Sequence, residues 1–230
     1  MTRPRLYVGN RNYSSWSLRP WLALTWGGLD FETVDVDLDQ PGYGQGQIAE
    51  VLAVSPTGRV PALHVGELVV WDSLAIAEWA AEQAPSLWPR DPAARAVARA
   101  VTCEMHAGFA AVRRDLPMNL RRRTRAHGLP AETMADLARL DALWSSTRAR
   151  WGADGPYLFG ARSIADAFFA PVATRFRTYA IDLSPPAAAY RDALLADDGF
   201  RAWEDLVLAT PAERFTSSDV DDRYGALTSP

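Results

Sequence analysis

Short apolar runs, some alternating with polar residues, dominate the first third of the chain. Four runs predict strands, at residues 5–9, 31–38, 60–65 and 68–71. Gly66-Glu67 separates the last two and indicates a tight hairpin. Three helices are predicted between and after these strands, at residues 17–28, 48–54 and 73–83. This order predicts a small α/β sandwich with a four-stranded mixed sheet.

After residue 83 the pattern becomes helical almost throughout. The segment "APSLWPRDP" (84–92) contains three prolines, which indicates a linker, and Asp91-Pro92 is typical of a helix start. Four further helices are predicted, at residues 131–152, 163–180, 185–196 and 200–210. The sequence therefore predicts an α/β domain, a linker, an all-α domain and a polar tail, at residues 1–83, 84–92, 93–215 and 216–230.

The first predicted helix follows a cluster of serines. Proline is tolerated only in the first turn of a helix, so Pro20 predicts a helix that begins no earlier than about Ser17. Ser17 is then the expected N-cap. Ser14 and Ser15 are predicted to lie on the loop before it.

Charge and cysteine content narrow the classes of function. The net charge of −4 argues against a dedicated nucleic-acid binder. All 24 Lys-plus-Arg positions are arginine, so any anion site must use arginine, histidine, amides or backbone N–H groups. We expect a cytoplasmic protein, because the first apolar run does not fit a signal peptide and no run has the length of a membrane helix. The single cysteine, Cys103, is expected to be buried, so thiol chemistry would need a thiol from outside.

Four motifs in a fixed order resemble the bacterial glutathione S-transferase family. They are "SSWSLR", "SPTGRVPAL", "WDSLAIAEW" and "SIADAFFAP", which begin at residues 14, 55, 71 and 163. The resemblance implies a thioredoxin-like amino-terminal domain, an all-α carboxy-terminal domain and a homodimer. It also implies that glutathione is the co-substrate and that no metal is needed.

The resemblance assigns roles to particular residues. Val60-Pro61 resembles the family's valine before a cis-proline, whose backbone pairs with the cysteine part of glutathione. Asp72-Ser73 resembles the acidic-serine pair that holds the γ-glutamyl end, although either residue can simply cap the following helix. Gln45 and Gln47 are the candidates for the glycine end.

A serine hydroxyl is the expected activator of the thiol. A thiol with a pKa near 8.5 is mostly protonated at neutral pH, and only the thiolate is nucleophilic. In serine-using branches of the family the catalytic hydroxyl stands five residues before the helix arginine, and counting back from Arg19 gives Ser14. Ser15 and Ser17 remain competitors, and Tyr13 is a further candidate.

The electrophile is expected to lie against the second domain. The stretch "CEMHAGFAAVRR" (103–114), predicted to lie on one long helix, offers His106, Phe109 and Arg113 as substrate neighbours. Phe109 is equally compatible with core packing, and His106 with an ordinary helix histidine. The expected activity is attack of the thiolate on a small hydrophobic electrophile.

Other functions remain open. "SSWSLR" resembles the zeta-type "SSCSWR" of maleylacetoacetate isomerases, but Trp16 replaces the motif cysteine, which argues against isomerisation and mixed-disulfide chemistry. A non-catalytic protein of the same fold that binds glutathione or another ligand is an alternative. An isomerase, a dehalogenase or an ether-cleaving lyase would use the same thiolate. The three histidines show no metal-ligand spacing.

Overall fold

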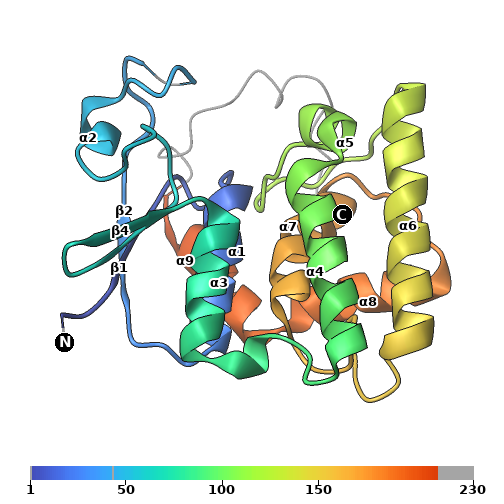
Figure 1. Cartoon of the computed structure of the whole chain (residues 1–230). Coiled ribbons are helices and arrows are strands. Elements are labelled where there is room, and N and C mark those ends of the chain that lie inside the picture. The colour runs from blue at the N-terminus through green and yellow to red at the C-terminus, as the bar shows by residue number, and fades with distance from the viewer. Residues whose placement is uncertain (1, 43, 212–230) are drawn as a thin grey trace.

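The computed structural model describes residues 2–42 and 44–211. Figure 1 shows a sheet with its helices beside a larger group of helices. The predicted tail, residues 216–230, and the last residues of the predicted second domain lie outside the described residues. The exact domain limits and the linker at residues 84–92 remain predictions.

The first part is the predicted four-stranded mixed sheet. Its strands are β1 (Arg5–Val8), β2 (Glu32–Asp35), β3 (Ala62–Val65) and β4 (Leu68–Trp71), in the order β2-β1-β3-β4. β1 and β2 are parallel, and the other two pairs are antiparallel. The hairpin between β3 and β4 turns at Gly66-Glu67, which confirms the prediction.

Helices cover both faces of this sheet. One face packs against α1 (Ser15–Trp26) and α3 (Ser73–Gln83), which also contact each other (Figure 1). The other face buries a small cluster together with the loop and helix around α2 (Ala49–Leu52), formed by Tyr7, Val36, Ile48 and Val51. The α/β sandwich is therefore the thioredoxin-like arrangement that the sequence predicts.

The second part is helical, as predicted. After a short 3-10 turn, η1 (Pro85–Leu87), come α4 (Pro92–Ala107), α5 (Ala110–Asp115), α6 (Ala131–Trp151), α7 (Ile164–Thr178), α8 (Pro185–Ala196) and α9 (Asp198–Ala209). Almost every residue of α7 is buried, and α7 contacts α1, α4 and α8. α7 is therefore the central helix, and it carries the second part of the core up to the first.

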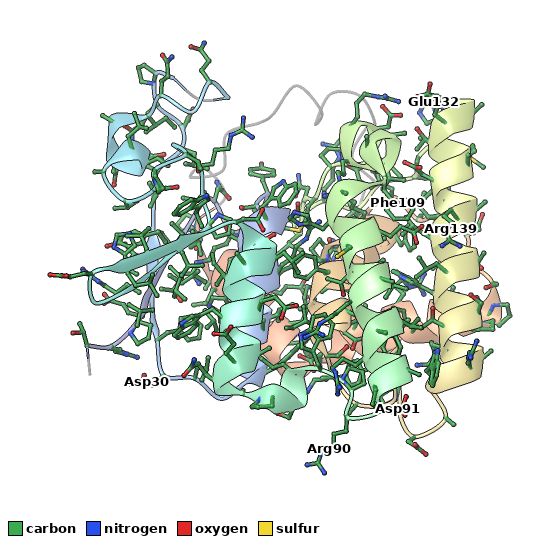
Figure 2. The ribbon with its side chains drawn as sticks, in the orientation of Figure 1. Asp30, Arg90, Asp91, Phe109, Glu132 and Arg139 are labelled. Carbon is green, nitrogen blue, oxygen red and sulfur yellow. The ribbon has the colours of Figure 1, made fainter. Side chains whose placement is uncertain are left out.

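An ion pair joins two long helices of this part. Figure 2 labels Arg139 on α6, whose guanidinium donates to Glu104 on α4 through Nε and Nη2 at 2.7 and 2.8 Å. Cys103, also on α4, is exposed rather than buried as predicted. On α4 the side chains of Thr102 and Met105 face the core instead, and both are fully buried.

The predicted start of the first helix is wrong. α1 begins at Ser15, with Ser14 as its N-cap, so that Pro20 lies inside the helix. The Ser14 hydroxyl oxygen accepts the N–H of Ser17 at 3.3 Å and satisfies one of the free donors of the first turn. This cap and the buried core face of α1 offset the single backbone bond that proline cannot make.

The prediction of one long helix through residues 103–114 is also wrong. α4 ends at Ala107, and α5 begins only at Ala110. A Cβ atom at Gly108 would lie 2.7 Å from the Glu104 carbonyl oxygen, so the turn needs glycine. Phe109 follows in the left-handed region with φ 59°. Arg113 therefore projects from α5, in a direction that a continuous helix would not give it.

A buried carboxylate fastens the end of α1 to the helical part. Asp197 is 5% exposed. It accepts hydrogen bonds from Trp26 Nε1 at 2.8 Å, the Tyr157 hydroxyl at 2.7 Å, Arg162 at 3.1 Å and the N–H of Phe200 at 3.1 Å. Burial raises the pKa of Asp197, but the four donors outweigh burial and leave the pKa below its usual value.

Replacing Asp197 with asparagine should lower the free energy of unfolding by about 1.5–3 kcal/mol at neutral pH. A carboxyl whose pKa is lower in the folded state stabilises the fold at pH values above its unfolded-state pKa. This stabilisation is lost as the pH falls through the folded-state pKa. The difference between wild type and variant should therefore shrink below about pH 4. Urea unfolding at neutral and acidic pH measures it, and an equal difference at both would contradict an electrostatic role.

Candidate functional site

The loop between β1 and α1 brings the candidate hydroxyls to one end of the sheet. Ser14 is half-buried, and its hydroxyl donates to Ser17 Oγ at 2.8 Å. Ser17 is fully buried, and its oxygen also accepts the Gly9 N–H at 3.2 Å. Capping uses only a lone pair of Ser14 Oγ, so the hydroxyl can donate to a ligand if its proton turns away from Ser17 Oγ.

Ser15 has different surroundings. It is 5% exposed, and its oxygen lies 3.4 Å from Nη2 of Arg175 on α7. A donated bond from a guanidinium leaves the Ser15 proton available, but the side chain is more deeply buried than Ser14. Both predicted serines therefore remain candidates for the catalytic residue, and Ser14 is the more accessible of the two.

The predicted Val60-Pro61 motif lies beside this loop. The peptide bond between the two residues is cis, as the resemblance implies. A Cβ atom on Gly9 would lie 3.1 Å from a Val60 methyl group, so Gly9 and Val60 are neighbours. Because Gly9 is bonded to Ser17 and Ser17 to Ser14, a continuous set of contacts joins the cis-proline segment to the candidate catalytic hydroxyl.

Asp72 and Ser73 stand at the start of α3, on the same edge. Asp72 is the N-cap, with φ 73°, and its Oδ1 accepts the N–H of Leu74 at 2.7 Å. The resemblance and the simple capping role therefore coexist. Ser73 is 1% exposed, and its Oγ has no hydrogen-bond partner among the described residues. A buried hydroxyl without a partner costs free energy unless a ligand or water satisfies it.

Gln45 and Gln47 lie on the loop before α2, and both are exposed. Backbone contacts hold this loop against the turn that leads to Val60. A Cβ atom on Gly58 would lie 2.0 Å from the Gly46 carbonyl oxygen, and Gly58 has φ 62°. The loop therefore lies near the site, and the role of the two glutamines at the glycine end stays a prediction.

The predicted substrate neighbours do not share one surface. His106 at the end of α4 faces Trp16 edge-on with ring centroids 5.5 Å apart. Arg113 on α5 also lies against Trp16, with its guanidinium carbon 5.1 Å from the centroid of the Trp16 ring. Phe109, labelled in Figure 2 where α4 meets α5, is 6% exposed and belongs to the core. His106 and Arg113 thus approach the first turn of α1, whereas Phe109 supports them from within.

The sequence analysis named Arg113 but did not predict that Arg19 and Arg175 lie with it in a buried arginine group. Arg19 is fully buried, and none of its three nitrogens has a hydrogen-bond partner among the described residues. Its guanidinium lies 4.5 Å from the Trp16 ring centroid and 5.0 Å from that of Phe168. Burial lowers the pKa of Arg19 well below its usual value, and the charges of Arg113 and Arg175 lower it further.

The other two arginines are also buried in part. Arg175 is 4% exposed and donates to the carbonyls of Leu116 at 2.8 Å and Pro171 at 2.9 Å. Burial, with the charge of Arg113, lowers the pKa of Arg175 to about 9. Burial likewise lowers the pKa of Arg113, whose Nη1 has no hydrogen-bond partner among residues 2–42 and 44–211. Arg19 and Arg113 thus have nitrogens without a partner among the described residues, whereas all three nitrogens of Arg175 have partners. The three guanidinium groups together form a cluster that could bind an anion.

Asn12 is a second residue that the sequence analysis missed. It is 1% exposed, and its Oδ1 accepts the backbone N–H groups of Leu120 and Arg121 at 3.0 and 3.1 Å. Its Nδ2 donates to Asn119 Oδ1 at 3.0 Å. These bonds fasten the loop that carries Ser14 to the helical part of the chain.

The described residues contain neither a metal-binding cluster nor a membrane-spanning helix. Among residues 2–42 and 44–211, no three side chains of His, Cys, Asp or Glu gather into a group that would hold a metal ion. No helix within these residues has the length and apolar character needed to cross a bilayer.

Known proteins share both the sequence and the fold. Residues 13–83 match the family described as glutathione S-transferase, N-terminal domain. The maleylacetoacetate isomerase of Rattus norvegicus is 31% identical over 86% of this chain and 91% of its own length. The maleylpyruvate isomerase of Ralstonia sp is also 31% identical, over 79% of this chain and 86% of its own length.

A solved structure agrees with these sequence matches. It is the theta class glutathione S-transferase of Xanthomonas axonopodis pv. citri with glutathione bound, which is 25% identical with a TM-score of 0.62. The match covers 88% of this chain and 97% of the transferase. The full-length match to the rat protein and the family match in the first domain lead to one conclusion. The chain belongs to the glutathione S-transferase family.

Proposed function

We propose that this enzyme binds glutathione at the edge of the sheet and activates its thiol with the hydroxyl of Ser14. In this proposal the Val60 backbone pairs with the cysteine part of the tripeptide. Asp72 and Ser73 receive its γ-glutamyl end, and Gln45 or Gln47 receives its glycine end. Ser15 is the alternative donor to the thiolate.

One observation carries the proposal: the predicted residues form a closed ring of contacts. Ser14 bonds to Ser17, Ser17 to Gly9, and Gly9 lies beside Val60. From there the β3–β4 pairing of Ala62 with Trp71 leads to Asp72.

The second half of the ring runs through the helical part. His106 lies 3.5 Å from Asp72 and packs against Trp16, two residues from Ser14. Contacts thus link residues from four separate segments of the chain, which supports one common binding site for an extended peptide.

The chemistry needs only a neutral donor. Lowering a thiol pKa by two units requires about 2.7 kcal/mol of preference for the thiolate. One hydrogen bond to a charged acceptor contributes about 1.5–3 kcal/mol. The amino terminus of α1 adds about 0.3–1 kcal/mol. Ser14, at the N-cap of this helix, supplies both contributions from one position.

The arginine group indicates the class of electrophile. Arg19, Arg113 and Arg175 bring three positive charges to the Trp16 side of the site. A guanidinium with unused donors favours a carboxylate. We therefore assign the enzyme small electrophiles that carry a carboxylate, with an apolar part against Trp16 and Phe168.

A second candidate reaction is glutathione-dependent isomerisation. The two relatives with long alignments are named maleylacetoacetate isomerase and maleylpyruvate isomerase. Addition of a thiolate to a conjugated double bond makes that bond single, so rotation and loss of the thiolate give the other isomer. The arginine group supports carboxylate-bearing substrates of this kind, whereas Trp16 in place of the motif cysteine separates this chain from the zeta-type pattern.

Retention on immobilised glutathione and turnover with two electrophiles test the function. The proposal predicts that the protein is retained on immobilised glutathione. It also predicts that the protein conjugates glutathione to a general aromatic electrophile, which is measured by the appearance of the thioether. Conversion of a cis-configured enoyl carboxylate without net consumption of glutathione would identify the isomerase. Retention without either reaction would favour a non-catalytic binding protein.

Replacing Arg19 with methionine should separate stability from specificity. Exchange of a buried charge for an apolar side chain of similar length is often neutral or stabilising, so the melting temperature should stay or rise. kcat/KM for a carboxylate-bearing electrophile should fall about 10- to 100-fold, as expected for one lost charged bond. An uncharged electrophile of matched reactivity should change less than about threefold. Equal losses for both would contradict the assignment.

We assign a homodimer, because the edge strand β4 leaves Leu68 51% and Trp71 47% exposed, and a second subunit would cover this apolar surface. A cytoplasmic location and a role in detoxification of electrophiles fit the small-molecule chemistry. Light scattering on the purified chain measures the subunit number.

A further inference from the structure

One half-exposed ring lies against a buried charge near the start of α1. Arg19 has no exposed surface, and the ring centroids of Trp16 and Phe168 lie 4.5 and 5.0 Å from its guanidinium carbon. Phe168 is fully buried, whereas Trp16 is 39% exposed. Of the two rings that lie against the Arg19 guanidinium, only that of Trp16 therefore reaches solvent.

The guanidinium of Arg19 lacks an acceptor. None of its three nitrogens has a hydrogen-bond partner among the described residues. Burial lowers the pKa of Arg19, the charges of Arg113 and Arg175 lower it further, and Asp72 acts in the opposite direction. Contact with aromatic faces offsets only part of the cost of burying such a charge. A carboxylate would supply charge-assisted hydrogen bonds to these nitrogens, which a ring cannot do.

Two further side chains hold the Trp16 ring where it lies. The guanidinium carbon of Arg113 is 5.1 Å from the Trp16 ring centroid, and His106 meets the ring edge-on at 5.5 Å. Nη1 of Arg113 is buried and has no hydrogen-bond partner in the part of the chain that the structure describes. The Trp16 ring therefore lies against two guanidinium groups that both have unused donors.

The position of Trp16 in its helix allows the ring to move. Trp16 is the second residue of α1, after the N-cap Ser14 and the first residue Ser15. The rotamers of a helical side chain are restricted mainly by the turn before it, and no helical turn precedes residue 16. The ring can therefore change its rotamer while the backbone of α1 stays in place.

We infer that Trp16 is a specificity-determining residue, whose ring covers the Arg19 guanidinium in the free protein and swings aside when a carboxylate-bearing ligand binds. This inference rests on the proposed function, in which the arginine group receives the carboxylate of the electrophile. A carboxylate gains charged bonds that offset the lost ring contacts, whereas an uncharged ligand gains none. The cover therefore discriminates against uncharged ligands at Arg19, and it lowers the affinity for anions by the cost of moving the ring.

Chemical labelling tests whether Trp16 covers Arg19. Phenylglyoxal is uncharged and reacts with accessible guanidinium groups, and peptide mass mapping gives the rate at each arginine. Arg90, an exposed residue that Figure 2 labels just before α4, is the internal standard. Relative to Arg90, Arg19 should react at least about tenfold faster in Trp16→Ala than in wild type. Trp16→Phe is the matched control, which should stay closer to wild type because a ring remains.

Calorimetry with two small probes tests whether a carboxylate displaces the ring. Malonate carries two carboxylates, and malonamide has a similar shape without the charge. Malonate should bind Trp16→Ala about tenfold more tightly than wild type, because no ring has to move, and malonamide should bind neither. The double variant Trp16→Ala/Arg19→Met should lose this gain, since the donors that the ring covers are gone.

Fluorescence follows the ring itself. Trp16 is one of nine tryptophans, so the difference between the emission of wild type and that of Trp16→Phe isolates its contribution. Saturating malonate should shift this difference spectrum to longer wavelength, because the displaced ring enters water. Malonamide at the same concentration should leave it unchanged.

Four results would overturn the inference, once melting temperatures establish that each variant folds. They are wild-type Arg19 as reactive as Arg90, equal reactivity of Arg19 in wild type and Trp16→Ala, equal malonate affinities of these two proteins, and no spectral shift at saturating malonate. If malonate binds none of the proteins, the assignment of carboxylate-bearing electrophiles is overturned as well. Retention of wild type on immobilised glutathione does not depend on these results, so it tests the glutathione part of the proposed function separately.

Discussion

Replacing Ser14 with alanine is expected to raise the pKa of the bound glutathione thiol by about two units. At pH 7 a shift from about 6.5 to about 8.5 reduces the thiolate fraction, and with it turnover, about 25-fold. Activity should recover as pH rises, because a thiol without its donor still ionises in base. The absorbance of the thiolate in the binary complex gives the pKa, and kcat against pH gives the kinetic effect.

Two matched variants make the result specific to Ser14. Ser14→Thr keeps both the hydroxyl and the N-cap, so it should retain most of the activity. Ser15→Ala removes the hydroxyl beside Arg175 and should leave the thiol pKa unchanged. Loss of the cap in Ser14→Ala lowers stability by only about 1 kcal/mol, so the variant should fold. If Ser15→Ala shifts the thiol pKa and Ser14→Ala does not, Ser15 is the donor.

Replacing Asp166 with alanine is expected to lower the free energy of unfolding by about 3–5 kcal/mol. Asp166 is fully buried, and it accepts bonds from the N–H of Leu158 at 3.1 Å and the N–H of Ser163 at 2.8 Å. The hydroxyls of Ser163 and Tyr190 donate at 2.8 and 2.7 Å. The variant leaves four buried donors without an acceptor.

Part of this loss is offset. Burial raises the pKa of Asp166, so removing the carboxyl also removes a desolvation cost. Urea unfolding measures the net effect. Asp192→Ala is the control, since Asp192 is 64% exposed, pairs with its neighbour Arg191, and should matter by less than about 0.5 kcal/mol. Similar midpoints for the two variants would show that the Asp166 bonds do not stabilise the fold.

The sequence predicted the elements whose patterns are local. Short apolar runs marked the strands, Gly66-Glu67 marked the hairpin, and Asp91-Pro92 marked the start of α4, all of which the structure confirms. The order of these elements then implied the mixed sheet. Such features depend on neighbouring residues, so a single sequence contains the information for them.

The errors came from interactions over longer distances. Pro20 argued for a late start of α1, but a cap by Ser14 and burial against α3 and α7 outweigh one missing bond. Gly108 looked like one more residue of a helix, and only its close approach to the Glu104 carbonyl shows that the helix must end there. Local propensity cannot include the energy of contacts with distant segments.

Only the candidate site residues in the α/β part of the chain were predictable from the sequence. Ser14, Val60, Pro61, Asp72 and Ser73 stand in recognisable motifs, and their roles remain predictions to be tested. Arg19 and Arg175 come from helices far apart in the sequence, and a chain whose basic residues are all arginine gives no signal for a special one. The burial of both side chains, and the lack of partners for Arg19, are visible only in three dimensions.

The bonds of Asn12 have a consequence for engineering. The loop that carries Ser14, the proposed catalytic residue, is held in place by the hydrogen bonds of Asn12 with Asn119, Leu120 and Arg121. A chimera that joins this sheet module to the helices of a relative would have to import that tripeptide as well. Replacing only the helical part of the chain would therefore also disturb the loop that carries Ser14, because residues 119–121 of that part hold this loop.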